Sequence, residues 1–92
     1  MYKVILAKKY KRDLRLAIRQ GKDINLLEMA VDILSKGTRL PPEYNDHPLK
    51  GKYKGCRECH IAPDWLLVYK KYKDVLVVLL TRTGTHQDIF DE

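Results

Sequence analysis

The sequence predicts an α+β domain in which an N-terminal strand and a two-helix hairpin pack on an antiparallel β-sheet. The order of elements carries this prediction, because one short β-type run and two amphipathic helical segments precede a series of strand-like runs. The length of 92 residues fits a single domain over 1–92, and a hydrophobic content of 45% fits a folded globule rather than a disordered chain.

The first half of the chain is expected to hold the strand and both helices. Residues 2–6 have strand character, and residues 7–20 place apolar side chains on one face at helical spacing, with a glycine after them. A second helix is expected to begin near Asn25, where Asn25 and Glu28 resemble a capping box, and to end at Gly37. The short link between the two helices predicts an antiparallel pair.

The second half is expected to be a β-sheet that the chain enters through a long loop. This loop, residues 38–48, contains two consecutive prolines and ends in the turn signal Asn-Asp-His-Pro. Four strand-like runs follow, at residues 49–54, 56–61, 65–71 and 75–82. Residues 75–80 are apolar on both faces, which predicts a central strand. Residues 85–90 are expected to form a short tail or a single helical turn.

The charge favours a polyanionic partner. The net charge is +6 and the pI is about 9.4, and a cationic surface attracts phosphate and releases its counterions. Cations gather on the solvent face of the first helix, where one acid, Asp13, opposes them: Lys8, Lys9, Lys11, Arg12, Arg15 and Arg19. Such a face is either simply solvated or a contact for RNA or an acidic partner. Because no apolar segment is long enough for a signal peptide or a membrane span, we expect a cytoplasmic protein with reduced cysteines and no membrane partner.

The segment Cys56-Arg57-Glu58-Cys59-His60 matches the C-x-x-C-H pattern of c-type haem attachment and half of a zinc site. In the expected strand, however, Cys56 and Cys59 point to opposite faces and cannot share a haem, a metal or a disulfide. We therefore interpret both as ordinary strand residues. The same alternation puts His60 opposite Cys59 and Ile61, so His60 lies on the open face of the sheet if those two pack under the helices.

The residues suited to chemistry lie in three segments that together hold every histidine. Metal-free cleavage of RNA needs a base for the ribose 2′-OH, a cation for the charged phosphorane and an acid for the leaving 5′ oxygen. Histidine suits proton transfer because its ordinary pKa lies near neutrality. The chain offers proton-transfer groups, a cation and two aromatic platforms for unpaired bases: His47, His60, Asp64, His86, Arg82, Trp65 and Phe90. Each also has a structural reading, as a turn residue, a strand-end charge or, for Trp65, a core side chain.

Together these residues resemble the YafQ-type branch of the RelE/ParE superfamily, the toxins of bacterial type II toxin–antitoxin modules. The resemblance extends over essentially the whole chain and rests on an ordered set of residues: Asp46-His47-Pro48-Leu49, Gly51, Lys54-Gly55, Arg57-Glu58, His60, Pro63-Asp64-Trp65, Leu67, Tyr69, Arg82, Gly84, His86 and Phe90. It implies a RelE-like fold and a ribosome-dependent, metal-independent endoribonuclease that cuts mRNA in the decoding site and halts translation. It also implies a cognate antitoxin of the DinJ or RelB type, bound in a resting hetero-oligomer, and no cofactor.

The resemblance implies a role for each proton-transfer residue. His86 is expected to be the general acid, and either Asp64 or His47 the base. Arg82 is expected to stabilise the phosphate, while His60 orients these groups or shares the proton transfer. Asp64 would need a raised pKa to act as the base, and burial beside its neighbouring tryptophan could supply it.

RNA contacts are expected from aromatic and cationic side chains. Trp65 and Phe90 would position the base next to the cut. Cations on the first helix and on the segment after the long loop would grip ribosomal and messenger RNA: Lys8, Lys9, Lys11, Arg12, Arg15, Arg19, Lys50, Lys52 and Lys54. Since a small site cannot easily hold flexible mRNA in line for phosphoryl transfer, the ribosome would supply that positioning.

Two other functions compete with the nuclease. A basic protein of the same fold could poison a macromolecular target without chemistry, as gyrase-directed ParE-like relatives do. Three histidines converging with Asp64 and Arg82 argue against it, because a binder has no need of them. A haem or zinc module would give a Soret band or stoichiometric metal, and we expect neither.

Overall fold

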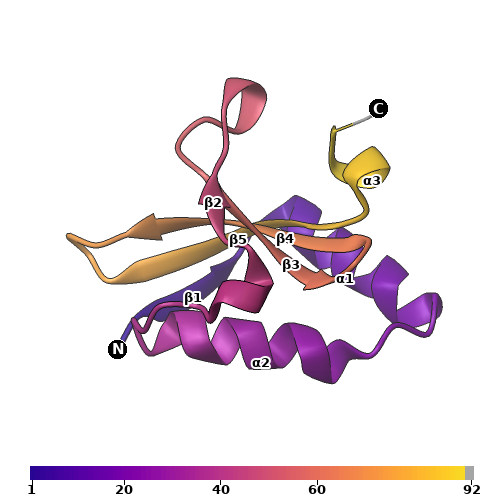
Figure 1. Ribbon diagram of the computed structural model, residues 1–92, viewed down its shortest axis with the longest axis horizontal. Helices are drawn as coiled ribbons and strands as arrows, with labels where there is room; N and C mark the ends of the chain where they lie inside the picture. Colours follow the sequence, from indigo (N-terminus) through magenta and orange to yellow (C-terminus); the bar gives the residue numbers. More distant parts are fainter. Residues whose placement is uncertain (91–92) are drawn as a thin grey trace.

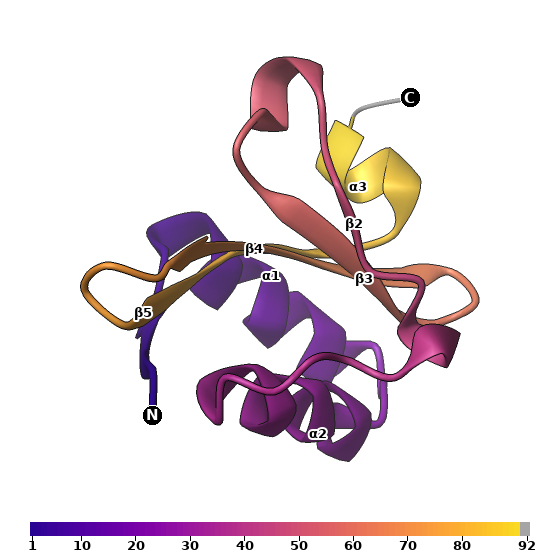
Figure 2. The same ribbon diagram turned by 60° about the vertical axis from the view of Figure 1, so that its left-hand side comes forward.

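The computed structural model describes residues 1–90 and has an α+β fold, as predicted. A five-stranded sheet carries α1 and α2 on one face and the short α3 on the other (Figures 1 and 2). The helices and strands are β1 (Lys3–Leu6), α1 (Lys8–Arg19), α2 (Ile24–Ser35), β2 (His47–Pro48), β3 (Arg57–Ala62), β4 (Trp65–Tyr72), β5 (Val77–Gly84) and α3 (His86–Phe90). Two 3-10 turns, η1 (Pro42–Tyr44) and η2 (Gly51–Tyr53), interrupt the connections.

The sheet is mixed: its antiparallel part is as predicted, and the N-terminal strand joins it in parallel. Its strand order is β1-β5-β4-β3-β2; β2 to β5 pair antiparallel, whereas β1 pairs parallel with β5, with Ile5 opposite Leu79. Both helices and three other strands separate β1 from β5 along the chain. No hairpin turn therefore fixes their relative direction, and tertiary packing decides it.

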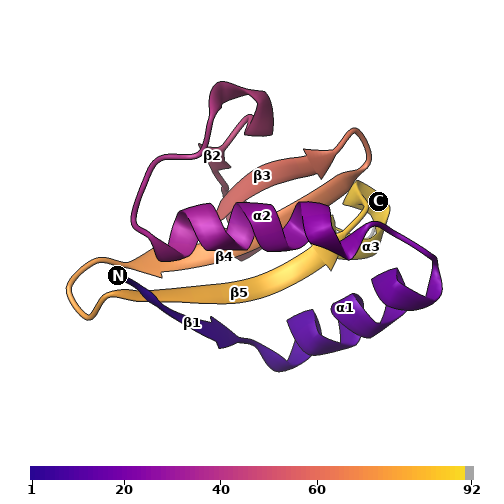
Figure 3. The same cartoon turned by 90° about the horizontal axis from the view of Figure 1, so that it is seen from below.

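The helices agree with the sequence prediction within a few residues, except for one cap. The Asp23 side chain, rather than that of Asn25, caps α2: it accepts a hydrogen bond of 3.1 Å from the backbone N–H of Asn25. The two helices run in opposite directions under the sheet (Figure 3). Among the helices of residues 1–90, none has the length and apolar content needed to cross a bilayer.

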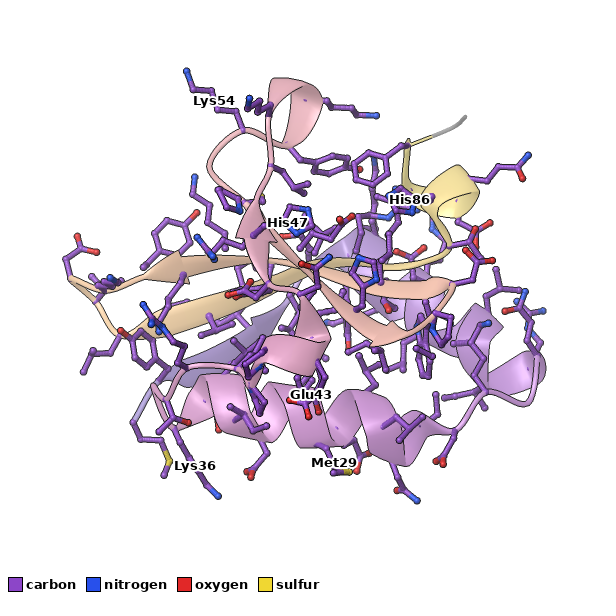
Figure 4. All side chains as sticks on the ribbon, viewed as in Figure 1. Met29, Lys36, Glu43, His47, Lys54 and His86 are labelled. Atoms are coloured by element: carbon purple, nitrogen blue, oxygen red, sulfur yellow. The ribbon has the colours of Figure 1, made fainter. Side chains whose placement is uncertain are left out.

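The strand predicted at residues 49–54 is absent, and this segment is a loop that leaves the sheet after β2. Gly51 and Gly55 have φ angles of +65° and +93°, which break an extended strand. Tyr53, which is buried, anchors the loop between them. Lys50, Lys52 and Lys54 are exposed on it, and Lys54 lies near its tip (Figure 4).

Each face of the sheet has its own apolar cluster. Under α1 and α2, the larger cluster includes Cys59, Leu67 and Tyr69. Under α3 and the loop, a smaller one includes Cys56 and Val68. The prediction that the two cysteines diverge to opposite faces is confirmed, and both are free thiols.

The buried Cys59 thiol should make the fold sensitive to alkaline pH. Burial raises the pKa of Cys59 from its ordinary value of 9.0 to about 12. The unfolded thiol thus ionises first, so its contribution to stability is full below about pH 9 and is lost as pH rises toward 12. Urea unfolding should show the free energy of unfolding falling between pH 9 and pH 10.5 by up to about 1.4 kcal/mol per pH unit from this group. In Cys59→Ala the fall should be shallower than in Cys56→Ala; equal slopes would contradict the assignment.

Candidate active site

The register of the sheet places the candidate residues on one face. His47, Glu58, Val68 and Arg82 lie opposite one another in a row across β2, β3, β4 and β5. Residues in such a row point to the same side of the sheet. The side is the one that α3 covers, because Val68 belongs to the cluster that packs against α3. His60 lies two residues after Glu58 in β3 and shares this face, as predicted.

A buried carboxylate, Glu58, lies between two of the histidines. Its Oε2 lies 3.0 Å from His47 Nε2, and its Oε1 lies 4.0 Å from His86 Nε2. The Glu58 side chain is 3% exposed, whereas those of His47 and His86 are 41% and 56% exposed. Oε1 has no hydrogen-bond partner within residues 1–90. Both histidines thus meet one buried acid and remain open to a ligand, on the side of the sheet seen at the top of Figure 4.

The sequence prediction did not include Glu58 among the site residues. A signal was available, since strand alternation puts Glu58 on the same face as His60. In the sequence alone Glu58 looks like an ordinary surface charge, because His47 comes beside it only through the pairing of β2 with β3.

Both ring nitrogens of His47 face protein oxygens. Its Nδ1 is 2.8 Å from the carbonyl oxygen of Asn45, which can only accept, so Nδ1 carries a proton. Its Nε2 lies 3.0 Å from Oε2 of the Glu58 carboxyl group. Each ring nitrogen of His47 therefore already has a protein oxygen beside it. The His60 ring centroid is 6.4 Å from that of His47, and the His60 ring makes no hydrogen bond within residues 1–90.

His86 is placed by a capping box at the start of α3. The Thr85 backbone N–H donates to Asp88 Oδ2 and the Asp88 N–H donates to Thr85 Oγ1, at 3.1 and 3.0 Å. His86 is consequently the first helical residue, two positions after the end of β5. Its ring lies against Phe90, with centroids 5.5 Å apart, and the Phe90 ring meets Tyr53 edge-on at 5.6 Å. Phe90 and Tyr53 thus support the imidazole of His86 from the side.

Arg82 is held by an acid that the sequence prediction did not assign to the site. Its Nε donates to Asp13 Oδ2 at 2.6 Å, and its Nη2 donates to Asp13 Oδ1 at 3.2 Å. Nη1 and Nη2 also donate to the Tyr53 hydroxyl and the Asp88 carbonyl, both at 3.3 Å. The hydrogen bonds to Asp13 raise the pKa of Arg82 above its ordinary value. Arg82 thus connects α1, β5, α3 and the loop that carries Lys50, Lys52 and Lys54. To stabilise a phosphate directly, Arg82 would have to exchange its hydrogen bonds to Asp13 for bonds to the phosphate.

Trp65 does not offer the stacking platform that was predicted. Trp65 is 3% exposed, belongs to the cluster under α1 and α2, and donates a hydrogen bond of 2.8 Å from Nε1 to Thr83 Oγ1. It therefore lies on the face opposite the histidines. Asp64 is exposed in the turn between β3 and β4, so the burial required for its role as base is absent. Phe90, which is half-buried beside His86, keeps a place in the site.

A substitution of Trp65 separates a core role from a stacking role. We expect Trp65→Phe to lower stability by about 1–2 kcal/mol, because the hydrogen bond to Thr83 is lost while most of the ring remains. The activity per folded molecule should stay close to that of the wild type. A loss of activity in a variant that is fully folded by circular dichroism would show that the indole itself takes part.

The predicted RNA-contact cations are solvent-accessible. The cations on α1, namely Lys8, Lys9, Lys11, Arg12, Arg15 and Arg19, are all exposed, as are the three lysines of the loop. The loop lysines lie on the face of the histidine site, and α1 adds a second basic region on the other face, which suits an anionic chain as ligand.

Sequence and structure comparisons place the chain in a family. Residues 2–91 match the family model described as the bacterial toxin of type II toxin–antitoxin systems, YafQ. The mRNA interferase toxin YafQ of Escherichia coli K12 is 43% identical over 82 residues, which cover 88% of this chain and 87% of the relative.

Solved structures agree with this match. A metal-bound toxin from Helicobacter pylori superposes with a TM-score of 0.91 at 41% identity, covering 98% of this chain and 100% of that one. YafQ from the Escherichia coli DinJ–YafQ toxin–antitoxin complex superposes with a TM-score of 0.87 at 37% identity, covering 97% of both chains. The chain therefore belongs to the YafQ family of bacterial type II toxins.

Proposed function

We propose that this protein is an mRNA interferase that cuts mRNA on the ribosome by metal-independent acid–base attack of the ribose 2′-OH. The observation that carries the proposal is the pair of open histidines, His47 and His86, on one buried carboxylate, Glu58. A protein that only binds its target has no use for a buried acid shared by two solvent-accessible imidazoles. The likeness to a relative named as an mRNA interferase toxin supports the same reaction.

Each histidine has a distinct task in the proposed mechanism. His60, whose ring nitrogens make no hydrogen bond within residues 1–90, takes the proton of the 2′-OH as the 2′ oxygen attacks phosphorus. His86, more than half exposed at the start of α3, gives a proton to the 5′ oxygen as the P–O5′ bond breaks. The products are a 2′,3′-cyclic phosphate and a 5′-hydroxyl. His47, 41% exposed beside Glu58, supplies positive charge in its protonated form to the phosphorane oxygens.

Arg82 has a supporting part in this proposal. The guanidinium fixes the Asp88 carbonyl and the Tyr53 hydroxyl, and so holds α3 and the loop against the sheet. Since His86 begins α3 and Phe90 ends it, Arg82 positions the general acid. Asp64, exposed in the β3–β4 turn, is left to contact RNA rather than to act as the base.

Dependence on the ribosome follows from the openness of the site. His47 and His86 are 41% and 56% exposed, so the site is an open surface that does not by itself hold a flexible RNA in one shape. In-line attack needs the 2′ oxygen, phosphorus and 5′ oxygen nearly collinear, and positioning of this kind is worth many kcal/mol. The ribosome would supply it, with the cations on α1 and the loop gripping ribosomal and messenger RNA.

The proposed partner at rest is an antitoxin of the DinJ type. The neighbouring YafQ structure was determined with DinJ, and the family is defined by toxin–antitoxin pairs. An acidic antitoxin segment would complement the net charge of +6 of this chain in the cytoplasm.

Primer extension on an mRNA tests the proposal, with and without programmed ribosomes. Wild type should cut only with ribosomes, and His86→Ala should reduce the cleavage rate by about 10²–10⁴-fold. Gln87→Ala, which alters the next exposed residue, should cut normally. Cleavage of free RNA would make the protein a self-sufficient nuclease. No cleavage by folded, antitoxin-free protein would favour a ParE-like toxin that acts by binding alone.

A further inference from the structure

A basic cavity lies outside the histidine site, beneath the edge of the sheet at β2. It has a volume of about 400 Å³ and lies between the end of α2, the start of β3 and the end of β4. Four of its lining residues are cations: Arg39, Arg57, Lys71 and Lys73. These four residues were not among those predicted to contact RNA, and the proposed mechanism does not use them.

The floor of the cavity is a fixed polar network. Tyr69, 2% exposed, lies opposite Arg57 in the β3–β4 register and donates a hydrogen bond of 2.7 Å to Asp46 Oδ1. The Nε of Arg57 donates to both oxygens of Asp46, at 3.3 and 3.2 Å. Lys71 follows Tyr69 on the same face of β4, and Lys73 lies in the turn directly after that strand. The guanidinium of Arg57 is therefore preorganised.

Most of the positive charge has no counter-charge. The hydrogen bonds from Arg57 to Asp46 use Nε alone, which leaves the two terminal amino groups of Arg57 able to reach an anion. Within residues 1–90, Arg39 and Lys73 form no ion pair, and the Nζ of Lys71 lies 4.9 Å over the ring of Tyr2. One carboxylate thus faces four cations, so an anion entering the cavity would relieve their mutual repulsion.

The end of α2 does not cancel this charge. A helix C-terminus carries partial negative charge on its last carbonyl groups. Here the carbonyl of Ser35 accepts a hydrogen bond of 2.7 Å from the Tyr2 N–H. The carbonyls of Asp32 and Leu34 accept from the N–H groups of Lys36 and Gly37. These bonds leave little of the terminal dipole to oppose an anion.

We propose that this cavity binds a phosphodiester group of RNA, at a distance along the chain from the scissile bond. The terminal amino groups of Arg57 form the planar fork that suits phosphate oxygens. The volume of the cavity admits a phosphate with part of a ribose. Asp46 directly precedes His47, and Arg57 directly precedes Glu58, so the cavity and the histidine site lie on opposite sides of the same two strands. An RNA chain that bends over the short edge strand β2 reaches both. This inference rests on the proposed function for the identity of the RNA.

The test measures RNA binding of the full-length protein in a His86→Ala background, so that RNA is not cut. The cavity variant is Arg39→Gln with Lys73→Gln, both exposed side chains whose replacement leaves the Asp46 network intact. The control is Lys3→Gln with Lys36→Gln, which has the same net charge. Lys36 pairs with Asp32 and extends from the lower side of the molecule (Figure 4). The binding affinity is measured at several salt concentrations for three probes: a short single-stranded RNA, vacant ribosomes and ribosomes programmed with mRNA.

We expect the cavity variant to bind roughly tenfold more weakly than the control and to lose about 0.7 of salt slope for each single-strand phosphate contact removed. A loss confined to the oligonucleotide and programmed ribosomes identifies a phosphate of the mRNA. A loss with vacant ribosomes but not with the oligonucleotide identifies ribosomal RNA.

Equal binding of cavity variant and control to all three probes would overturn the inference. Weaker binding only to the antitoxin would also overturn it, and would assign the cavity to carboxylates of that partner. The proposed function is tested separately, because it fails if the wild-type protein makes no cut on programmed ribosomes. In that case the salt slopes still show whether the cavity binds RNA.

Discussion

Replacement of Glu58 by glutamine should lower the single-turnover cleavage rate on programmed ribosomes by about 10²–10⁴-fold. The buried carboxylate lies 3.0 Å from His47 and 4.0 Å from His86, so it orients both imidazoles and offers them a negative counter-charge. Glutamine has nearly the same shape but no charge. Because Glu58 is 3% exposed and cannot touch RNA, the apparent affinity for programmed ribosomes should change little.

Two further variants make this result specific. Glu58→Asp keeps the charge but withdraws it by one methylene, and we expect an intermediate rate. Glu43→Gln removes an exposed carboxylate from η1, on the side of the sheet away from His86, and should leave the rate unchanged (Figure 4). If Glu58→Gln cleaves as fast as Glu43→Gln, the histidines act without the buried acid and the proposed site is wrong.

Replacement of Asp13 by asparagine should cost the largest amount of stability, about 3 kcal/mol. Asp13 accepts three hydrogen bonds, two from Arg82 and one of 3.1 Å from the Thr83 N–H. The paired side chains are only 14% and 15% exposed, so the variant leaves a guanidinium charge largely buried without its counter-ion. In urea, the midpoint should fall while the slope of the transition is unchanged.

A double-mutant cycle separates the pair from the rest of α1. Adding Arg82→Met to Asp13→Asn should recover most of the lost stability, because no unpaired charge remains. Asp32→Asn breaks the exposed pair with Lys36 and should cost no more than about 0.5 kcal/mol. If Asp13→Asn lowers the free energy of unfolding by no more than Asp32→Asn does, the Arg82 charge is solvated in the folded protein.

Local patterns in the sequence were sufficient for the elements and for part of the site. Helical spacing identified α1 and α2, and strand alternation placed His60 opposite Cys59 and so on the open face. The stacking role of Trp65 came from its aromatic side chain and from the family resemblance rather than from alternation. In β4 Trp65 shares the face of Leu67 and Tyr69, so it packs in the core under α1 and α2, which was the other reading of this residue.

Pairings between distant segments were beyond the sequence. Asp13 and Arg82 are 69 positions apart, and nothing in either neighbourhood marks them as partners. The parallel pairing of β1 with β5 is of the same kind, since packing of the helices rather than a turn fixes it. Glu58 became visible as a site residue only when β2 and α3 brought His47 and His86 to it.

The most direct test of the proposed chemistry is cleavage of a message with a single 2′-deoxynucleotide on the 5′ side of the cut. We expect programmed ribosomes carrying this message to bind the toxin normally and to show no cut at that site. The all-ribose message should be cut at the same rate with and without a chelator that removes transition metals but leaves the ribosome intact. A cut in the deoxy-substituted message, or cleavage abolished by the chelator, would contradict metal-independent attack by the 2′ oxygen.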